Sequence, residues 1–208
     1  MVESTAAGTL QQPTWAELAR TAVAGAGVGT LMARDHRRAD AVPTLVRLEE
    51  QDGGVPLVVL DAANPAVERL LRCPVATLVV PGTEEFPTVQ LVGTFRPVRC
   101  ERGDRRIFRP TLLFVCLGGV RRQPVPVDAF RAAEPDPLAA VAVERLRHLE
   151  EEHADDLRVQ VLSLGHDADH VVPRSLDRYG LSVTVLASDG VRSLRLPLPA
   201  CSADRETR

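Results

Sequence analysis

The chain has 208 residues, of which 45% are hydrophobic and 25% charged, and its formal net charge at pH 7 is -3. This composition is typical of a globular protein with one large domain or two small ones. The weakly negative charge and the 3% content of aromatic residues argue against general nucleic-acid binding. We find no apolar run of membrane-spanning length, no signal-peptide pattern and no C-x-x-C pair among the four cysteines. We therefore expect a cytoplasmic protein with reduced thiols and no membrane partner.

The first predicted element is a short amphipathic helix. Thr14 and Glu17 have the spacing of an N-terminal capping box, and apolar residues recur at helical spacing from Trp15 onward. The glycine-rich run Gly25–Gly29 follows. A nucleotide-binding loop comes after a strand and begins a helix, whereas these glycines end a helix. We interpret them as a helix C-cap and a tight turn.

Short segments rich in apolar and β-branched residues, separated by turn residues, then indicate β-strands. The segments expected as strands are Thr30–Ala33, Val42–Leu48, Val55–Leu60, Val75–Val80, Val89–Val98, Leu112–Leu117 and Val120–Val127. One short helix, Pro65–Leu71, interrupts them, with Asn64 as its cap. The charged segment Arg99–Arg109 is predicted to be an exposed loop. This arrangement is typical of a closed or nearly closed antiparallel barrel.

The second half begins with a long helical pattern. Apolar residues recur in steps of three, four or eight from Leu138 to Leu164, which predicts a single helix. Two alternating segments, Leu181–Val185 and Val191–Leu196, are expected to form a hairpin. We therefore predict two domains, a barrel over residues 14–130 and a small α+β domain over residues 135–200.

His153 occupies a gap in the apolar series of this helix, four residues after Leu149 and four before Leu157. We therefore expect its imidazole to face the interior or a cleft. A buried, hydrogen-bonded histidine is the more common outcome at such a position, and a ligand is the alternative. His148 lies five residues earlier, about 140° around the helix axis. An unbroken helix would therefore prevent both rings from holding one metal ion.

Three ordered motifs resemble the C-terminal domain of HugZ-type haem-iron-utilisation proteins. They are the run His148–Leu157, the step Ser175–Leu181 with its Asp-Arg-Tyr-Gly sequence, and the closing segment Val191–Pro197. The strand-rich half resembles the partner domain of that family, the split β-barrel of pyridoxamine-phosphate-oxidase-like flavoproteins. The resemblance implies an α+β protein, with an FMN-binding-type split β-barrel followed by a small C-terminal α+β domain. It also implies a homodimer.

The same resemblance implies that the ligand is haem or a related tetrapyrrole, bound between the two domains. His153 is then the best candidate for the iron ligand. Further candidates for contacts to the cofactor are His148, Arg178, Tyr179, Arg121 and Arg122. Arginine side chains suit this role because they form charge-assisted hydrogen bonds with carboxylates such as the haem propionates.

Two departures from the family pattern shape the functional expectation. Flavin-binding split barrels hold the FMN phosphate around the third strand and the short helix after it, where this chain has Asp61 and no basic residue before Arg69. A phosphate dianion would be repelled there, so FMN is not expected to bind. Haem-degrading members use a histidine in a C-terminal tail, whereas no histidine follows His170. We expect a haem-binding protein of haem or iron utilisation, with or without ring cleavage. An FMN-dependent oxidoreductase and a non-catalytic regulatory binder are the alternatives.

Overall fold

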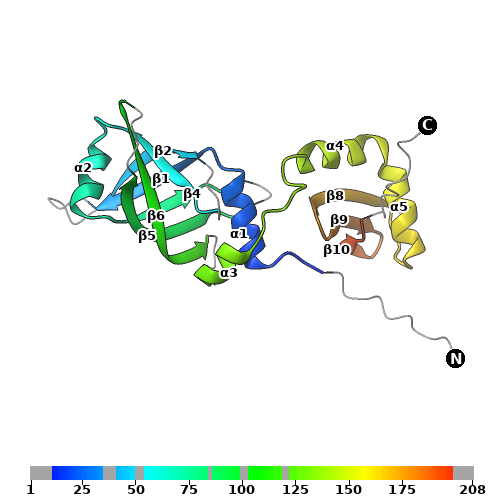
Figure 1. Cartoon of the computed structure of the whole chain (residues 1–208). Coiled ribbons are helices and arrows are strands. Elements are labelled where there is room, and N and C mark those ends of the chain that lie inside the picture. Colours follow the sequence, from blue (N-terminus) through cyan, green and yellow to red (C-terminus); the bar gives the residue numbers. More distant parts are fainter. Residues whose placement is uncertain are drawn as a thin grey trace, which may run out of the picture. The chain divides into compact units, whose positions relative to one another are not determined.

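The structure, a computed structural model, describes residues 11–34, 41–49, 54–83, 86–98, 103–118 and 122–198. It contains two compact units, one over Thr14–Asp136 and one that begins at Pro137 (Figure 1). The first unit is a β-barrel and the second is a smaller α+β unit, in agreement with the predicted fold class. No helix within the described ranges is both long enough and apolar enough to span a lipid bilayer.

The barrel is a closed sheet of six antiparallel strands. Its strands and helices are α1 (Trp15–Ala24), β1 (Val28–Arg34), β2 (Ala41–Glu49), β3 (Leu57–Asp61), α2 (Pro65–Arg72), β4 (Val75–Val80), β5 (Val89–Val98), β6 (Arg105–Leu117), β7 (Gln123–Val125) and α3 (Val127–Ala132). The strand order is β3-β2-β1-β4-β5-β6, and a further pairing of β3 with β6 closes the barrel. β7 extends the sheet beside β6.

Alternating side chains fill the barrel. β1, β4 and most of β5 alternate between buried and partly exposed residues, as expected for strands with one face in a core. Phe95 and Phe108 are among the largest fully buried side chains. The register between β5 and β6 shifts at Gly93, where an added Cβ would lie 2.4 Å from the Thr111 carbonyl oxygen. Only glycine fits this close approach of two strands.

Several predictions for this unit are confirmed. Thr14 and Glu17 form the capping box, and the Asn64 side chain caps α2. Two predictions are wrong. Part of the segment expected as a loop, from Arg105 onward, belongs to β6, because its backbone completes the ladder with β3. Among the described residues of the last expected strand, only β7 is extended, and Val120 and Arg121 lie outside the described residues. The new helix α3 begins at Val127 because its Phe130 is buried in the core.

Arg20 explains why the segment around α3 folds inward. Its side chain is buried, its Nε donates to the Ala133 carbonyl at 3.0 Å, and one terminal nitrogen donates to the Gly54 carbonyl. The guanidinium carbon lies 5.4 Å from the centre of the Phe130 ring, within range of a cation–π interaction. One side chain thus ties α1 to the segment before β3 and to the segment after α3.

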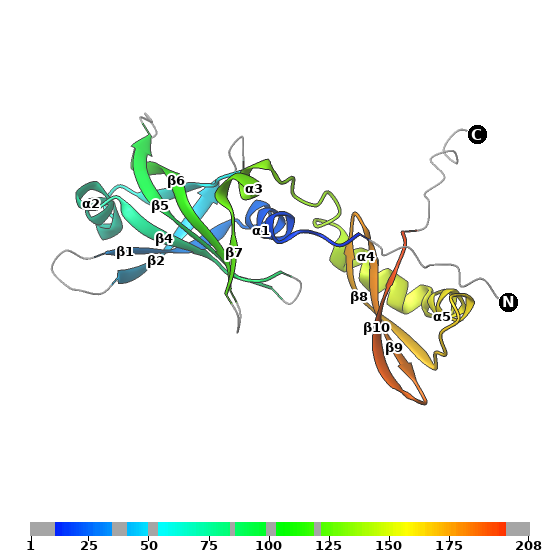
Figure 2. The same ribbon diagram turned by 90° about the horizontal axis from the view of Figure 1, so that it is seen from below.

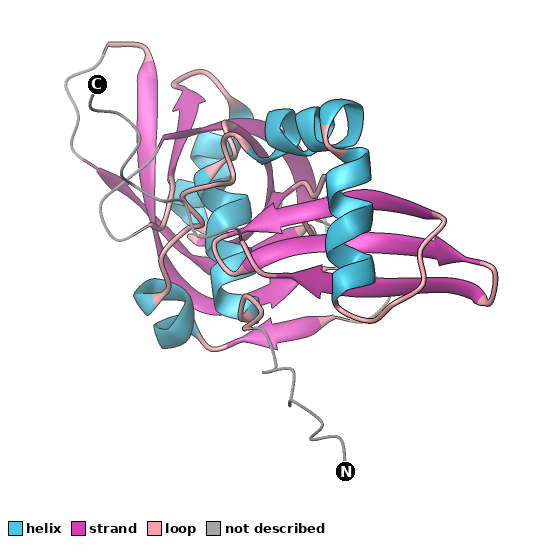
Figure 3. Cartoon of the chain, turned by 90° about the vertical axis from the view of Figure 1, so that its right-hand side faces the viewer, coloured by secondary structure: helices cyan, strands magenta, loops and turns pink. Residues whose placement is uncertain are grey.

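The second unit is a three-stranded antiparallel meander covered by two helices (Figures 2 and 3). Its elements are α4 (Ala142–Glu152), α5 (Ala154–Ser163), β8 (His170–Asp177), β9 (Gly180–Ala187) and β10 (Gly190–Leu196). Both helices pack on β8. The expected hairpin corresponds to β9 and β10, and the sequence did not predict the third strand, β8.

The single long helix expected here is wrong, because the helix breaks at His153. The backbone of His153 has φ -126° and ψ 17°, outside the α-helical range. Its N–H still donates to the Leu149 carbonyl and its carbonyl still accepts from Leu157 N–H, so the bend loses neither bond. Leu146 before the break and Leu157 after it are both buried in the same core. The bend lets both helices cover a sheet that one straight helix would leave partly open.

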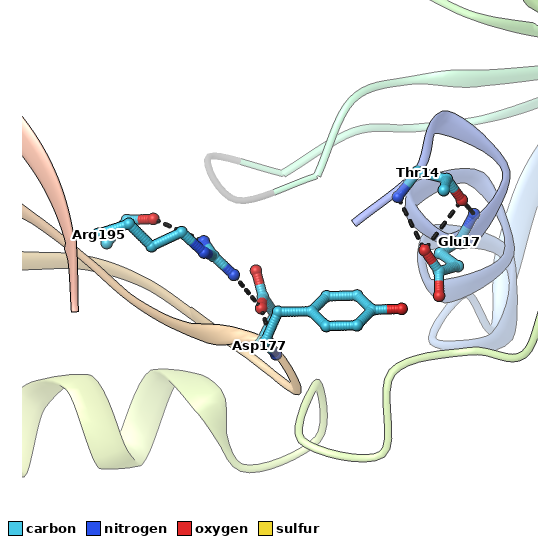
Figure 4. Close-up of polar contacts among 6 residues, drawn as sticks. Thr14, Glu17, Asp177 and Arg195 are labelled. Atoms are coloured by element: carbon cyan, nitrogen blue, oxygen red, sulfur yellow. Dashed lines mark hydrogen bonds and ion pairs between the residues drawn. The ribbon is translucent and has the colours of Figure 1, made fainter. Parts of the chain in front are cut away.

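The Asp-Arg-Tyr-Gly motif forms the tight turn between β8 and β9. Asp177 accepts a hydrogen bond from Tyr179 N–H at 2.8 Å, an Asx-turn, and forms an ion pair with Arg195 of β10 (Figure 4). Arg195 also donates to Ser182 Oγ at 2.9 Å. Gly180 has φ +155°, and a Cβ there would lie 2.5 Å from the Leu196 carbonyl oxygen. The Asx-turn fixes the turn itself, and the ion pair with Arg195 ties it to β10.

Candidate functional site

His153 is placed by the break between α4 and α5. Its Nδ1 lies 2.9 Å from the Asp156 carboxylate, one helical turn later, and 43% of its side chain is exposed. The expectation that this imidazole faces the interior is therefore wrong, because the break turns it toward the surface of the unit. A carboxylate beside Nδ1 favours the tautomer that carries its proton there. Nε2 is then the nitrogen with a lone pair free for a ligand.

His148 lies beside His153, contrary to the prediction for an unbroken helix. The two ring centres are 5.0 Å apart, and the ring planes are inclined at 77°. This edge-to-face contact exists because the break at His153 changes the angle between the two positions. His148 is exposed, so both imidazoles are open to solvent or to a ligand.

The protein ligands available near His153 suit a metal that already has other ligands, such as haem iron, better than they suit a bare metal ion. Within the described ranges, no group of three or more His, Cys, Asp or Glu side chains is placed to hold a metal ion. Structural zinc sites need four protein ligands and catalytic ones need three. Haem iron has four porphyrin nitrogens already and takes only one or two axial ligands from a protein. One histidine with a carboxylate partner therefore fits haem better than a free ion.

The remaining candidates for cofactor contacts are distributed over both units. Arg178 and Tyr179 form the half-buried turn between β8 and β9, in the same unit as the two histidines. The neighbouring Asp177 pairs with Arg195 of β10. Arg122 is exposed just before β7 of the barrel, and Arg121 lies outside the described residues. The structure thus places His148 next to His153. The roles expected for the arginines stay predictions.

The barrel has a pocket of its own, of about 220 Å³, on the outer side of β3. Its lining residues are Val28, Leu45, Val46, Arg47, Val59, Leu60, Asp61, Asn64 and Arg105. Asp61 lies directly opposite Arg105 in the β3–β6 ladder, and Arg47 lies opposite Val59 in the β2–β3 ladder. The expectation that no cation lies near Asp61 is therefore wrong. Strand pairing brings two arginines to it from distant parts of the sequence.

The pocket residues do not fit the phosphate of FMN, in spite of these arginines. The first amide donors of α2 are already used, because Ala66 N–H bonds to the Asn64 side chain at 2.9 Å and Val67 N–H bonds to the Asn64 carbonyl at 2.9 Å. Pro65 has no N–H to offer. No hydroxyl side chain is among the residues that line the pocket, and the Asp61 carboxylate lies at its wall. A dianion would meet one negative charge and no free helix amide.

Comparison with known structures supports the class of fold. No protein-family model matches the sequence, and no curated protein is significantly similar to it. Together, the barrel and the α+β unit have the architecture that the motifs predicted for a HugZ-type protein. The chain is similar to a haem-binding protein from Mycobacterium smegmatis, with 25% identity and a TM-score of 0.76 over 90% of this chain and 89% of that one. It also shares its fold with a protein of unknown function from Agrobacterium tumefaciens (15% identity, TM-score 0.50, 90% of each chain).

The sequence interpretation missed three residues of these sites. Asp156 was not singled out, although its spacing of three residues from His153 is that of neighbours on a helix. Arg47 and Arg105 were not connected with Asp61, because only the strand register shows that they are neighbours. A spacing argument would have found Asp156, whereas the two arginines required a correct pairing of β2, β3 and β6.

Proposed function

We propose that this protein binds haem and takes part in haem or iron utilisation. The observation that carries the proposal is the likeness to a haem-binding protein over about nine tenths of both chains. The motifs of the C-terminal unit support the same class of ligand. The proposal extends to binding and does not assign ring cleavage.

In this proposal His153 is the residue that would hold the haem iron. Haem would supply an iron centre that takes a histidine nitrogen as ligand. Asp156 orients the His153 ring through Nδ1, which is the usual arrangement around a ligating histidine. His148 packs its ring against His153 and restricts its rotation. The half-exposed position supports this role, because a cofactor reaches such a ring without unfolding the core.

We also propose that the chain forms a homodimer through the outer face of the barrel. A row of uncharged residues crosses five neighbouring strands in register, from Pro43 through Met32, Thr77 and Val92 to Phe114. Exposed apolar side chains flank this row, including Leu45 and Leu113, which is 61% exposed. Contiguous apolar patches of this kind are covered in most soluble proteins, and a second copy is the commonest partner.

Titration of haemin into the purified protein tests haem binding. The expected result is a saturable shift of the Soret band with one haem per chain. We also expect the bound haem to transfer only slowly from the protein to apomyoglobin. Absorbance that increases linearly with haemin, without saturation, would show only non-specific association and would overturn the proposal. Replacement of the partly exposed His166 by alanine serves as a control for adventitious histidine ligation, and its titration should match the unchanged protein.

A further inference from the structure

We propose that the pocket on the outer side of β3 binds a small monocarboxylate that also carries a hydrogen-bond donor, an ammonium or hydroxyl group next to the carboxylate. The pocket belongs entirely to the barrel unit, and the proposal does not depend on haem binding. The proposed ligand is smaller than a flavin and differs in charge from the flavin phosphate, which the pocket residues do not fit.

Two side chains of opposite charge lie next to each other at the pocket without pairing. Asp61 and Arg105 are directly opposed on β3 and β6, where Cβ atoms of antiparallel strands lie about 4.5–5.5 Å apart. Neither side chain forms a hydrogen bond or ion pair with another residue of the described ranges. Both line the same cavity. A ligand with a carboxylate and a donor would pair with both side chains at once.

The net charge of the side chains that line the pocket also favours a single carboxylate. Arg47 and Arg105 contribute two positive charges and Asp61 contributes one negative charge, which leaves a net charge of +1. That balance suits a single carboxylate, which accepts charge-assisted hydrogen bonds from guanidinium groups. The carboxylate of Asp61 then accepts from the neighbouring ammonium or hydroxyl group. The phosphate monoester dianion of FMN offers no such donor and is repelled by the Asp61 carboxylate.

The volume of the pocket and its apolar lining residues limit the size of the ligand. The volume of about 220 Å³ is below the range of about 300–1,000 Å³ typical of pockets for drug-sized ligands. Val28, Val59 and Leu60 form apolar surface between the charged groups. A compact molecule with a short aliphatic part therefore fits, whereas an isoalloxazine ring would extend far outside.

Amide chemical shifts in two-dimensional NMR test the proposal on the full chain. The probes are glycine, glycolate, acetate, inorganic phosphate and FMN, each titrated separately. We expect glycine or glycolate to shift amides of β3 and the start of β6, with acetate weaker and with no effect from phosphate or FMN. A stronger response to glycine than to glycolate identifies the donor as ammonium, and the reverse identifies it as hydroxyl.

Matched variants establish that the pocket is responsible. Arg105→Gln should weaken binding about tenfold or more, because it removes a charge-assisted bond. Arg96→Gln makes the same change at an exposed position of β5 outside the pocket and should leave binding unchanged. Asp61→Asn should remove the preference for glycine or glycolate over acetate. If Arg105→Gln disturbs the barrel spectrum, Arg47→Gln takes its place with the same expected loss.

Three outcomes would overturn the proposal. The first is that none of the probes shifts the amides of β3 or β6 at tens of millimolar concentration. The second is that phosphate or FMN binds more tightly than glycine and glycolate to the unchanged protein. Equal binding by Arg105→Gln and by the unchanged protein would place any response elsewhere on the surface, and would equally contradict it.

Discussion

At the scale of single residues, Asp177 shows how a motif that suggests a ligand site can have a folding role. Its carboxylate accepts from the Tyr179 backbone and pairs with Arg195, and only 16% and 14% of the two ionic side chains are exposed (Figure 4). A pair with so little exposure leaves an uncompensated charge when one partner is removed. The Asp-Arg-Tyr-Gly motif therefore encodes the β8–β9 turn, whatever further contacts Arg178 and Tyr179 make.

Asp177→Ala should destabilise the C-terminal unit by about 3 kcal/mol, because Arg195 is left without its carboxylate partner. Native-state hydrogen exchange of amides in β8, β9 and β10 measures this without interference from the barrel. Asp189→Ala is the matched control, since the Asp189 carboxylate is well exposed in its pair with Arg192. That control should cost at most about 1 kcal/mol. Equal losses for the two variants would show that the Asp177 pair contributes no more than a surface pair.

At the scale of elements, the sequence predicted most strands and helices because their periodicity is local. The capping box, the short helix after Asn64 and the strands β1 to β5 all follow from residue spacing. The break at His153 was not predictable from periodicity, because the apolar series continues across it with helical spacing. The bend arises from packing both helices on one small sheet, which is a tertiary effect.

The join between β9 and β10 depends on Gly180 as well as on side chains. Gly180→Ala places a Cβ against the Leu196 carbonyl and keeps a backbone conformation that alanine disfavours. Gly190→Ala has the same backbone problem at φ +136° but meets no atom within 4 Å. We expect Gly180→Ala to cost about 1 kcal/mol or more beyond Gly190→Ala, as for overpacking. Hydrogen exchange of the β10 amides measures the difference, and a greater loss from Gly190→Ala would contradict the steric argument.

At the scale of the whole molecule, strand pairing determines which charges meet. Arg47, Asp61 and Arg105 are far apart in the sequence and line one pocket only because β3 pairs with both β2 and β6. The sequence identified the barrel class but not this register, so it misjudged the charge around Asp61. His153 was singled out from the sequence and its role in binding stays a prediction, whereas its partner Asp156 and its exposure were not foreseen.

We expect the whole molecule to be a homodimer. Light scattering after gel filtration should give about twice the chain mass of 22.6 kDa. Leu113→Asp should yield monomers, because a charge would be buried in the proposed interface. Val191→Asp is the matched control at an exposed apolar position of β10 in the other unit, and it should remain dimeric. A strictly monomeric unchanged protein at micromolar concentration would rule out the homodimer.

The central claim is that the protein binds haem through His153, and the haemin spectrum of His153→Ala tests it most directly. Circular dichroism first establishes that the variant is folded. We expect the Soret shift to be lost in His153→Ala and to return when free imidazole is added, whereas His148→Ala keeps the shift with altered affinity. A folded His153→Ala that binds haemin with an unchanged Soret band and unchanged stoichiometry would contradict the assignment.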